Sequence, residues 1–319
     1  MSRVDLSERL DPQMLAAVEK QVELVPPSGP LRDQPIERVR AHYKQDRAFW
    51  NADRPELPKV EDASLPGPFG PIPLRLYYPG GEALYPALVY LHGGGWIVGD
   101  LDTHDKIMRL LALKAGVAVV GVDYRLAPEH KFPSQLEECL TVLRHLAAEG
   151  GDWNIDGARL AVGGDSAGAN MSAALCQILA GEGASPLKAA VLYYGAFGLR
   201  DSVSRRKYGG EEDGMSADDL AYYVDCLVRQ PEDLRDPRFD VLSGDLTALP
   251  PSFIAAAEFD PIVDDSLVLA DLLAEAGLEH RLRLYPGVLH GFLHLTRMVE
   301  VAGTAIDESA LWLREKLKP

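Results

Sequence analysis

The chain has 319 residues and a formal net charge of −16, with 47% apolar and 25% charged residues. This balance is typical of a soluble globular protein, with enough chain for one large domain or for a core with a smaller cap. The acidic surplus disfavours nucleic acids and anionic membrane surfaces, whose phosphates attract clustered lysine and arginine, so we expect neither as a partner.

The N-terminal segment is charged and lacks the apolar stretch of a signal peptide. No apolar run approaches the ~18 residues needed to span a bilayer. The three cysteines, Cys139, Cys176 and Cys226, cannot all pair with one another and do not have metal-ligand spacing. We therefore predict a cytoplasmic protein with free, buried thiols and no stable membrane association.

Residues 1–50 contain two stretches of helical periodicity, over 10–22 and 36–50, separated by a break rich in Pro and Gly. Their apolar side chains fit two roles equally well, lining an acyl pocket or packing this segment onto the rest of the protein. These side chains are Val22, Leu24, Tyr43, Phe49 and Trp50.

From about residue 60, short apolar runs alternate with helical segments. The runs typical of strands lie at 72–78, 87–91, 117–123, 160–163, 189–194, 253–257 and 281–285. Helices are predicted near 103–115, 134–148, 167–181, 265–276 and 303–317. Continuous apolar strands separated by helices indicate a mostly parallel sheet covered on both faces, with ligands bound at the carboxyl ends of the strands.

The stretch 199–245 interrupts this alternation. It is polar and rich in Gly and Asp, and it contains one predicted helix that begins near Ser216, with Asp219 at the third helical position. We predict a cap built from an N-terminal segment, 1–50, and an insertion, 199–245, over a body formed by residues 51–198 and 246–319.

Three sites follow predicted strands, and the first is Gly164-Asp165-Ser166-Ala167-Gly168. A serine in a strand-to-helix turn needs a strained backbone, and flanking glycines remove the side chains that would clash with it. Such a serine presents its hydroxyl at the positive end of a helix. An ordinary glycine-rich turn is the alternative for this motif taken alone.

The second site is His92-Gly93-Gly94-Gly95-Trp96, directly after the strand at 87–91. Successive glycines let backbone N–H groups approach a reacting carbonyl closely, which is what an oxyanion hole requires. A phosphate-binding loop is the less favoured interpretation, because the motif lacks both GxGxxG spacing and a Walker lysine.

The third site consists of Asp260 and His290, each near the end of a predicted strand. A serine hydroxyl needs an imidazole base that a carboxylate orients, and the order Ser, Asp, His is that of the α/β-hydrolase triad. Asp264 and Asp265 are rival acids, but they stand where a helix N-terminus favours acidic residues. His290 and His294 have a metal-pair spacing without a third ligand at suitable spacing, so we expect no metal.

The chain resembles the hormone-sensitive-lipase family of α/β-hydrolases, that is, the bacterial family IV carboxylesterases of the GDSAG subfamily, over about residues 77–292. The strings that carry the resemblance are HGGGW at 92–96, DYRLAPEHKFP at 123–133, GGDSAGAN at 163–170, FDPIVDD at 259–265 and YPGVLHGF at 285–292. The resemblance implies an α/β-hydrolase fold, with a mostly parallel eight-stranded sheet, helices on both faces and a helical cap.

The same resemblance implies roles for individual residues. The catalytic residues would be Ser166 as nucleophile, His290 as base and Asp260 as the acid that orients it. The oxyanion hole would be formed by the N–H groups of Gly93, Gly94 and Ala167. His92 would support the glycine loop structurally. Asp165, beside Ser166, is favoured on its position as a residue that stabilises the turn, and we expect no cofactor or metal.

The predicted function is a serine carboxylesterase that hydrolyses short- to medium-chain acyl esters of small molecules through an acyl-enzyme. An amidase, lactonase or arylformamidase would use the same triad, and a non-catalytic small-molecule receptor is disfavoured because His290 is present. Family members are often homodimers, which we expect here as well.

Overall fold

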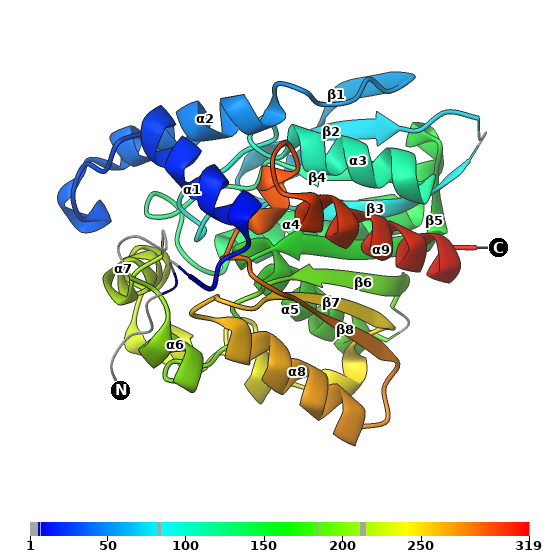
Figure 1. Ribbon diagram of the computed structural model, residues 1–319. Coiled ribbons are helices and arrows are strands. Elements are labelled where there is room, and N and C mark those ends of the chain that lie inside the picture. Colours follow the sequence, from blue (N-terminus) through cyan, green and yellow to red (C-terminus); the bar gives the residue numbers. More distant parts are fainter. Residues whose placement is uncertain (1–5, 7, 82–83, 184, 211–214, 319) are drawn as a thin grey trace.

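Eight strands form one twisted sheet in the computed structural model, which describes residues 6, 8–81, 84–183, 185–210 and 215–318 (Figure 1). The order across the sheet is β1-β2-β4-β3-β5-β6-β7-β8. The strands are β1 (Lys59–Gly67), β2 (Gly70–Tyr78), β3 (Tyr85–Leu91), β4 (Ala118–Val122), β5 (Ile155–Asp165), β6 (Leu187–Tyr193), β7 (Ser252–Ala257) and β8 (His280–Tyr285).

The sheet is mostly parallel, as predicted. Strands β1 and β2 are antiparallel to their neighbours, and every pair from β4 through β8 is parallel. Seven of the eight strands match the apolar runs of the sequence; β1 was not predicted. It is an edge strand whose side chains are mostly exposed or half-buried, so its sequence KVEDASLPG lacks a continuous apolar run.

Helices cover both faces of the sheet, because alternate side chains of each strand point to opposite sides. Val89 and Leu91 belong to the core on one face, with α4, α5 and α8, whereas Leu88 and Tyr90 belong to the core on the other, with α3 and α9. The helices of the described residues are α1 (Pro12–Leu24), α2 (Ile36–Asn51), α3 (Asp105–Ala115), α4 (Ser134–Glu149), α5 (Ala167–Gly181), α6 (Val203–Lys207), α7 (Ala217–Leu227), α8 (Val263–Glu275) and α9 (Glu300–Lys316). Short 3-10 helices are η1 (Leu31–Asp33), η2 (Gly150–Trp153), η3 (Pro231–Arg235), η4 (Val241–Ser243), η5 (Leu246–Ala248) and η6 (Phe292–Leu295).

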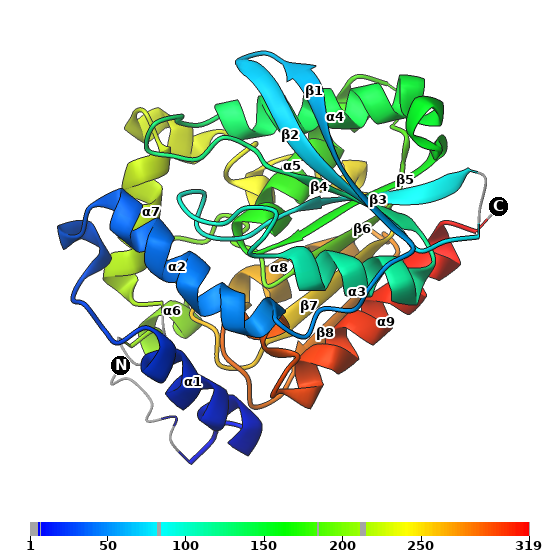
Figure 2. The same cartoon turned by 90° about the horizontal axis from the view of Figure 1, so that it is seen from above.

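Four helices, α1, α2, α6 and α7, gather at one end of the sheet in both cartoon views (Figures 1 and 2). Helix α7 begins where the sequence predicted, because the Ser216 side chain accepts the N–H of Asp219 and the Asp219 carboxylate accepts the N–H of Ser216. The short helix α6 was not predicted. The segments 1–50 and 199–245 therefore lie together, although they are far apart in the sequence.

At the centre of the sheet, the connections between successive strands change direction, and a crevice forms at this point. Strand β3 pairs with β4 on one side and β5 on the other, so successive connections leave it in opposite directions. In open α/β sheets, ligands bind at the carboxyl ends of strands at such a point. His92 follows β3 and Ser166 follows β5, so the glycine loop and the nucleophile candidate border the same crevice.

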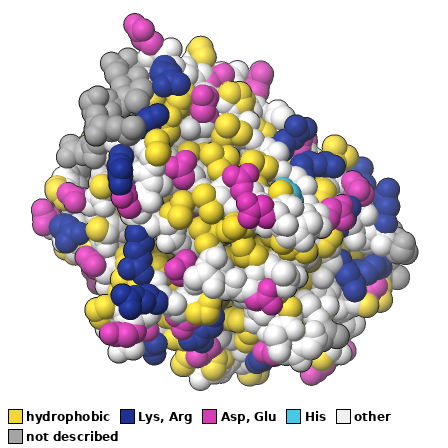
Figure 3. Space-filling view, turned by 90° about the horizontal axis from the view of Figure 1, so that it is seen from below, with side chains coloured by type: hydrophobic (Ala, Val, Ile, Leu, Met, Phe, Trp, Pro, Cys, Tyr) yellow, Lys and Arg dark blue, Asp and Glu magenta, His cyan; other side chains and the backbone are white. Residues whose placement is uncertain are grey.

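The molecular surface carries charges of both signs. On the face shown in Figure 3, lysine and arginine are interspersed with aspartate and glutamate, so the net charge of −16 does not form a single-sign field there. None of the helices in the described part of the chain has the length and apolar character needed to cross a membrane.

Candidate active site

Ser166 occupies a strained turn between β5 and α5. Its φ of 53° and ψ of −116° are a conformation that non-glycine residues rarely adopt. The turn presses against the end of β3, because a Cβ at Gly164 would lie 2.1 Å, and one at Gly168 1.9 Å, from the carbonyl oxygen of Leu91. The glycines of the GDSAG motif are therefore required for the close packing that positions Ser166.

His290 and Asp260 complete a hydrogen-bonded chain to this serine. His290 Nε2 lies 2.9 Å from Ser166 Oγ, and His290 Nδ1 lies 2.7 Å from Asp260 Oδ2. Asp260 is fully buried, and its other oxygen accepts the N–H of Ile262 at 2.9 Å. Tyr194 packs edge-on against the imidazole, with ring centroids 4.8 Å apart. The structure thus brings together the three residues that the sequence placed at separate strand ends.

The two rival acids have other partners. Asp264 Oδ2 accepts the N–H of Ser204 at 2.8 Å. Asp265 Oδ1 accepts three successive backbone N–H groups, those of residues 197–199, at 2.7 to 3.1 Å. Both carboxylates therefore hold the backbone at the start of the 199–245 segment by hydrogen bonds, and neither is bonded to His290.

The prediction that the Gly93 N–H faces a bound oxyanion is wrong. This N–H donates to Asp165 Oδ1 at 3.0 Å and is therefore not free for a substrate. Gly94 and Gly95 border the cavity that contains Ser166, and their N–H groups have no acceptor among the described residues. Ala167 is the first residue of α5, where a helix leaves its N–H groups without intrahelical partners. The donors available at this site are thus Gly94, Gly95 and Ala167.

Asp165 and His92 hold the glycine loop in place. Asp165 Oδ1 also accepts the Tyr90 hydroxyl at 2.8 Å, which links the residue before Ser166 to β3. The His92 ring stacks on Tyr124, with centroids 4.2 Å apart, and the Tyr124 hydroxyl donates to the His92 carbonyl at 2.6 Å. Burial, together with nearby His104, lowers the pKa of His92 to about 4, so this imidazole is neutral at pH 7.

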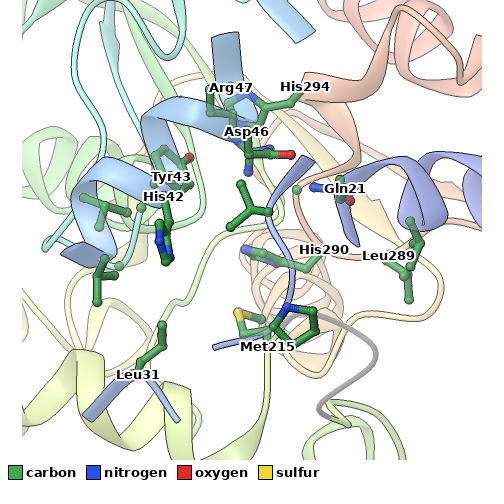
Figure 4. Close-up of a pocket in the computed structure, with 18 of the residues that line it drawn as sticks. Gln21, Leu31, His42, Tyr43, Asp46, Arg47, Met215, Leu289, His290 and His294 are labelled. Carbon is green, nitrogen blue, oxygen red and sulfur yellow. The ribbon is translucent and has the colours of Figure 1, made fainter. Parts of the chain in front are cut away.

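A cavity of about 900 Å³ leads to Ser166 and His290. Its walls come from α1, α2 and the loop between them, and also from Met215 and Tyr223 of the 199–245 segment (Figure 4). Two of the five N-terminal side chains whose role was open, Val22 and Tyr43, line it. Trp50, by contrast, is fully buried and packs edge-on against Phe49.

Several residues of the site were not found from the sequence. Gly95 belongs to a run of three glycines that the sequence cannot rank, and Tyr194 lacks a motif of its own. Tyr223 packs over Gly95, where an added Cβ would lie 2.6 Å from its ring. The signal that could have identified Tyr194 is its place immediately after a buried strand at the carboxyl edge.

Comparison with known proteins identifies the family. The model of a family with the α/β-hydrolase fold matches residues 88–294. The chain belongs to this family.

Relatives and solved structures agree with the match. An acetyl esterase of Salmonella choleraesuis (strain SC-B67) is 38% identical over 320 residues, which cover 99% of this chain and 98% of the relative. The structure of a hyperthermophilic esterase from Pyrobaculum calidifontis has a TM-score of 0.91 at 33% identity, covering 96% of this chain and 98% of that one. An ester-hydrolase from the metagenome of Lake Arreo, solved with a bipyridine phosphonate derivative, has a TM-score of 0.90 at 35% identity, with coverage of 96% and 98%.

These similarities confirm the resemblance to the hormone-sensitive-lipase family and the predicted class of enzyme. The protein is a carboxylic ester hydrolase of the α/β-hydrolase fold.

Proposed function

We propose that Ser166, His290 and Asp260 form the catalytic triad of this carboxylesterase. The observation that supports the triad is the continuous hydrogen-bonded chain of 2.9 and 2.7 Å at the base of an open cavity. Asp260 accepts from Nδ1–H, which leaves the lone pair of Nε2 for the serine proton. His290 then protonates the leaving alcohol, and water hydrolyses the acyl-enzyme with His290 again as base.

The oxyanion of each tetrahedral intermediate is held by the N–H groups of Gly94, Gly95 and Ala167. These groups lie on a loop and a helix start that are packed tightly against one another, so they need little rearrangement as charge develops. The positive end of α5 adds to the stabilisation at Ala167. Gly93 acts indirectly, through its bond to Asp165.

We further propose that the substrates are short-chain esters, with acetyl esters foremost. The acetyl esterase of Salmonella choleraesuis described above matches 99% of this chain at 38% identity, which favours acetyl esters over amides or lactones as substrates. The segments 1–50 and 199–245 act as a cap, because both contribute walls to the cavity over Ser166. A homodimer in solution and a cytoplasmic location remain predictions.

Hydrolysis of p-nitrophenyl acetate by Ser166→Ala protein tests the nucleophile. We expect no turnover above background and an unchanged thermal unfolding curve, with Ser185→Ala, in the loop after α5, as the matched control. Turnover near the wild-type rate in Ser166→Ala would remove Ser166 from the mechanism.

A series of p-nitrophenyl esters from acetate to laurate tests the acyl preference. We expect kcat/KM to be highest at acetate and to decline with chain length. A maximum at laurate would contradict the short-chain proposal without affecting the triad. Comparison of p-nitrophenyl acetate with the matched p-nitroanilide separates esterase from amidase action.

A further inference from the structure

A second cluster of reactive side chains lies next to the nucleophile and is not used by the triad. It consists of His104, at the start of α3, Asp165, at the end of β5, and His294, in η6. All three residues are buried, with exposed fractions of 0% to 4%, and one nitrogen or oxygen atom of each lies within 4.8 Å of the others. His290 and His294 alone lacked a third ligand in the sequence, because His104 is far away along the chain.

The hydrogen bonds of His104 show which of its nitrogens carries a lone pair. Thr103 Oγ1 donates to the carbonyl of Asp100 at 2.8 Å, so its hydrogen is not available to the ring. We therefore assign Nδ1–H as the donor in the contact of 2.9 Å between His104 Nδ1 and Thr103 Oγ1. In the neutral ring, Nε2 then carries a lone pair.

That lone pair faces an anion. His104 Nε2 lies 3.4 Å from Asp165 Oδ1 and has no hydrogen-bond partner among the described residues. A lone pair and a carboxylate oxygen repel each other in a buried site unless a proton or a metal cation lies between them. A neutral histidine held by a hydrogen bond at its other nitrogen is the usual form of a metal ligand.

His294 is also placed where it could bind a metal beside Asp165. Its Nε2 lies 3.8 Å from Asp165 Oδ2, and its ring meets that of His104 edge-on, with centroids 4.5 Å apart. His294 and Asp165 both border the 900 Å³ cavity, which offers a path for an ion, and Figure 4 shows His294 at the end of the cavity near Arg47 and Asp46.

We propose that His104, Asp165 and His294 form a binding site for a transition-metal dication such as Zn²⁺, and that its occupation inhibits the esterase. Two imidazoles and one carboxylate suit Zn²⁺ better than Mg²⁺ or Ca²⁺, and solvent in the cavity supplies the remaining ligand. Ligand atoms around a tetrahedral Zn²⁺ lie about 3.3 Å apart. Here His104 Nε2 lies 3.4 Å from Oδ1 of Asp165, His294 Nε2 lies 3.8 Å from Oδ2, and the three ligand atoms lie within 4.8 Å of one another, so a bound ion would draw them together.

The carboxylate of Asp165 is the anion of the cluster that remains available to a metal. Arg47 is paired with Asp46, with Nη1 and Oδ2 2.7 Å apart, so the carboxylate of Asp165 is not neutralised by it. Asp165 also accepts from Gly93 and Tyr90 and precedes Ser166. A metal that draws this carboxylate toward the two histidines shifts the glycine loop and the nucleophile turn together, which is why binding inhibits. This inhibition rests on the proposed function, whereas the binding does not.

Isothermal titration with ZnCl₂, on protein stripped with EDTA and dialysed into a buffer without phosphate, tests the site. We expect one Zn²⁺ per chain and no heat from MgCl₂. His104→Gln and His294→Gln should each weaken binding by more than about 10-fold, whereas His280→Gln, on the edge strand β8, should leave it unchanged. Co²⁺ bound to the wild-type protein should show the absorption bands of four-coordinate cobalt, a readout that does not depend on whether the variants fold. Absence of Zn²⁺ binding to the wild-type protein would overturn the proposal and leave a proton between His104 and Asp165.

Two further variants separate this site from the triad. Ser166→Ala and His290→Ala should bind Zn²⁺ as the wild type does, so failure of the proposed esterase mechanism is distinguishable from failure of the metal site. Wild-type turnover of p-nitrophenyl acetate should fall with added Zn²⁺ and return with EDTA. If Zn²⁺ binding is lost in His290→Ala and kept in His104→Gln, the catalytic histidine is the ligand and the proposal is overturned.

Discussion

Replacing Asp260 with asparagine tests the arrangement on which the proposed mechanism depends. His290 is held between Asp260 Oδ2, 2.7 Å from Nδ1, and Ser166 Oγ, 2.9 Å from Nε2. An asparagine amide can donate to Nδ1, which stabilises the tautomer with hydrogen on Nε2, and that nitrogen then cannot take the serine proton. The same exchange in a serine protease lowers kcat about 10⁴-fold, equivalent to about 5.5 kcal/mol.

The burial of Asp260 argues for an effect of similar size here. Its side chain is inaccessible to solvent and its other oxygen is engaged by the N–H of Ile262, so water cannot replace the lost acceptor. We expect kcat for p-nitrophenyl acetate at pH 7.5 to fall by about 10³- to 10⁴-fold, with KM changed much less, because the lost interaction matters mainly in the transition state.

Asp264→Asn is the matched control for this experiment. Asp264 lies four positions further along, but its carboxylate accepts the N–H of Ser204, a bond that an asparagine oxygen can also accept. The kcat of Asp264→Asn should stay within about 3-fold of wild type, because a substitution at a half-buried position that keeps the hydrogen bond to Ser204 has a small effect. Retention of more than about a tenth of the activity by Asp260→Asn, or an equal loss in both variants, would refute this assignment of the acid.

Two further predictions concern stability. Because the pKa of His92 is lowered to about 4 in the folded protein, the unfolded chain takes up a proton near pH 6.5 that the folded one excludes, and stability is lost as the pH falls through this range. Between pH 7.5 and pH 5, the free energy of unfolding measured in urea should therefore fall by about 2 kcal/mol less in His92→Gln than in the wild type. If the two proteins show the same pH dependence, His92 is not buried in its neutral form. Gly168→Ala should cost at least about 3 kcal/mol, seen as a lower Tm, because its Cβ would meet the Leu91 carbonyl at 1.9 Å. Gly181→Ala, where an added Cβ meets nothing within 4 Å, should be neutral or stabilising by up to about 1 kcal/mol, and equal losses in the two variants would contradict the packing argument.

The fold and the convergence of the strand ends could be predicted because they depend on local patterns. Buried parallel strands are continuous apolar runs, and each of Ser166, Asp260 and His290 follows one of them. The carboxyl ends of parallel strands meet at one edge of the sheet, so the order of these residues along the chain was enough to expect them together. Strand β1 could not be predicted in this way, because its side chains are mostly exposed or half-buried and form no apolar run.

The walls of the cavity could not be predicted, because similar residues in one segment have different partners. Val22 and Tyr43 face the cavity, whereas Trp50 donates its indole N–H to Asp46 and is enclosed by the core. All three are apolar or aromatic residues on helices of comparable pattern. Which side of each helix meets the sheet is decided by tertiary packing, which no local property of the sequence reports.

The proposed oxyanion donors show the same limit for single residues. Gly93, Gly94 and Gly95 have identical side chains, so the sequence has no means of ranking their N–H groups. The selection is made by Asp165, whose Oδ1 accepts the N–H of Gly93 and thereby leaves Gly94 and Gly95 facing the cavity. Because the same carboxylate adjoins Ser166, the register of the glycine loop and the position of the nucleophile depend on one buried charge. Any partner that competes for Asp165, including the metal proposed to bind His104 and His294, should therefore affect the proposed oxyanion donors and the proposed nucleophile together.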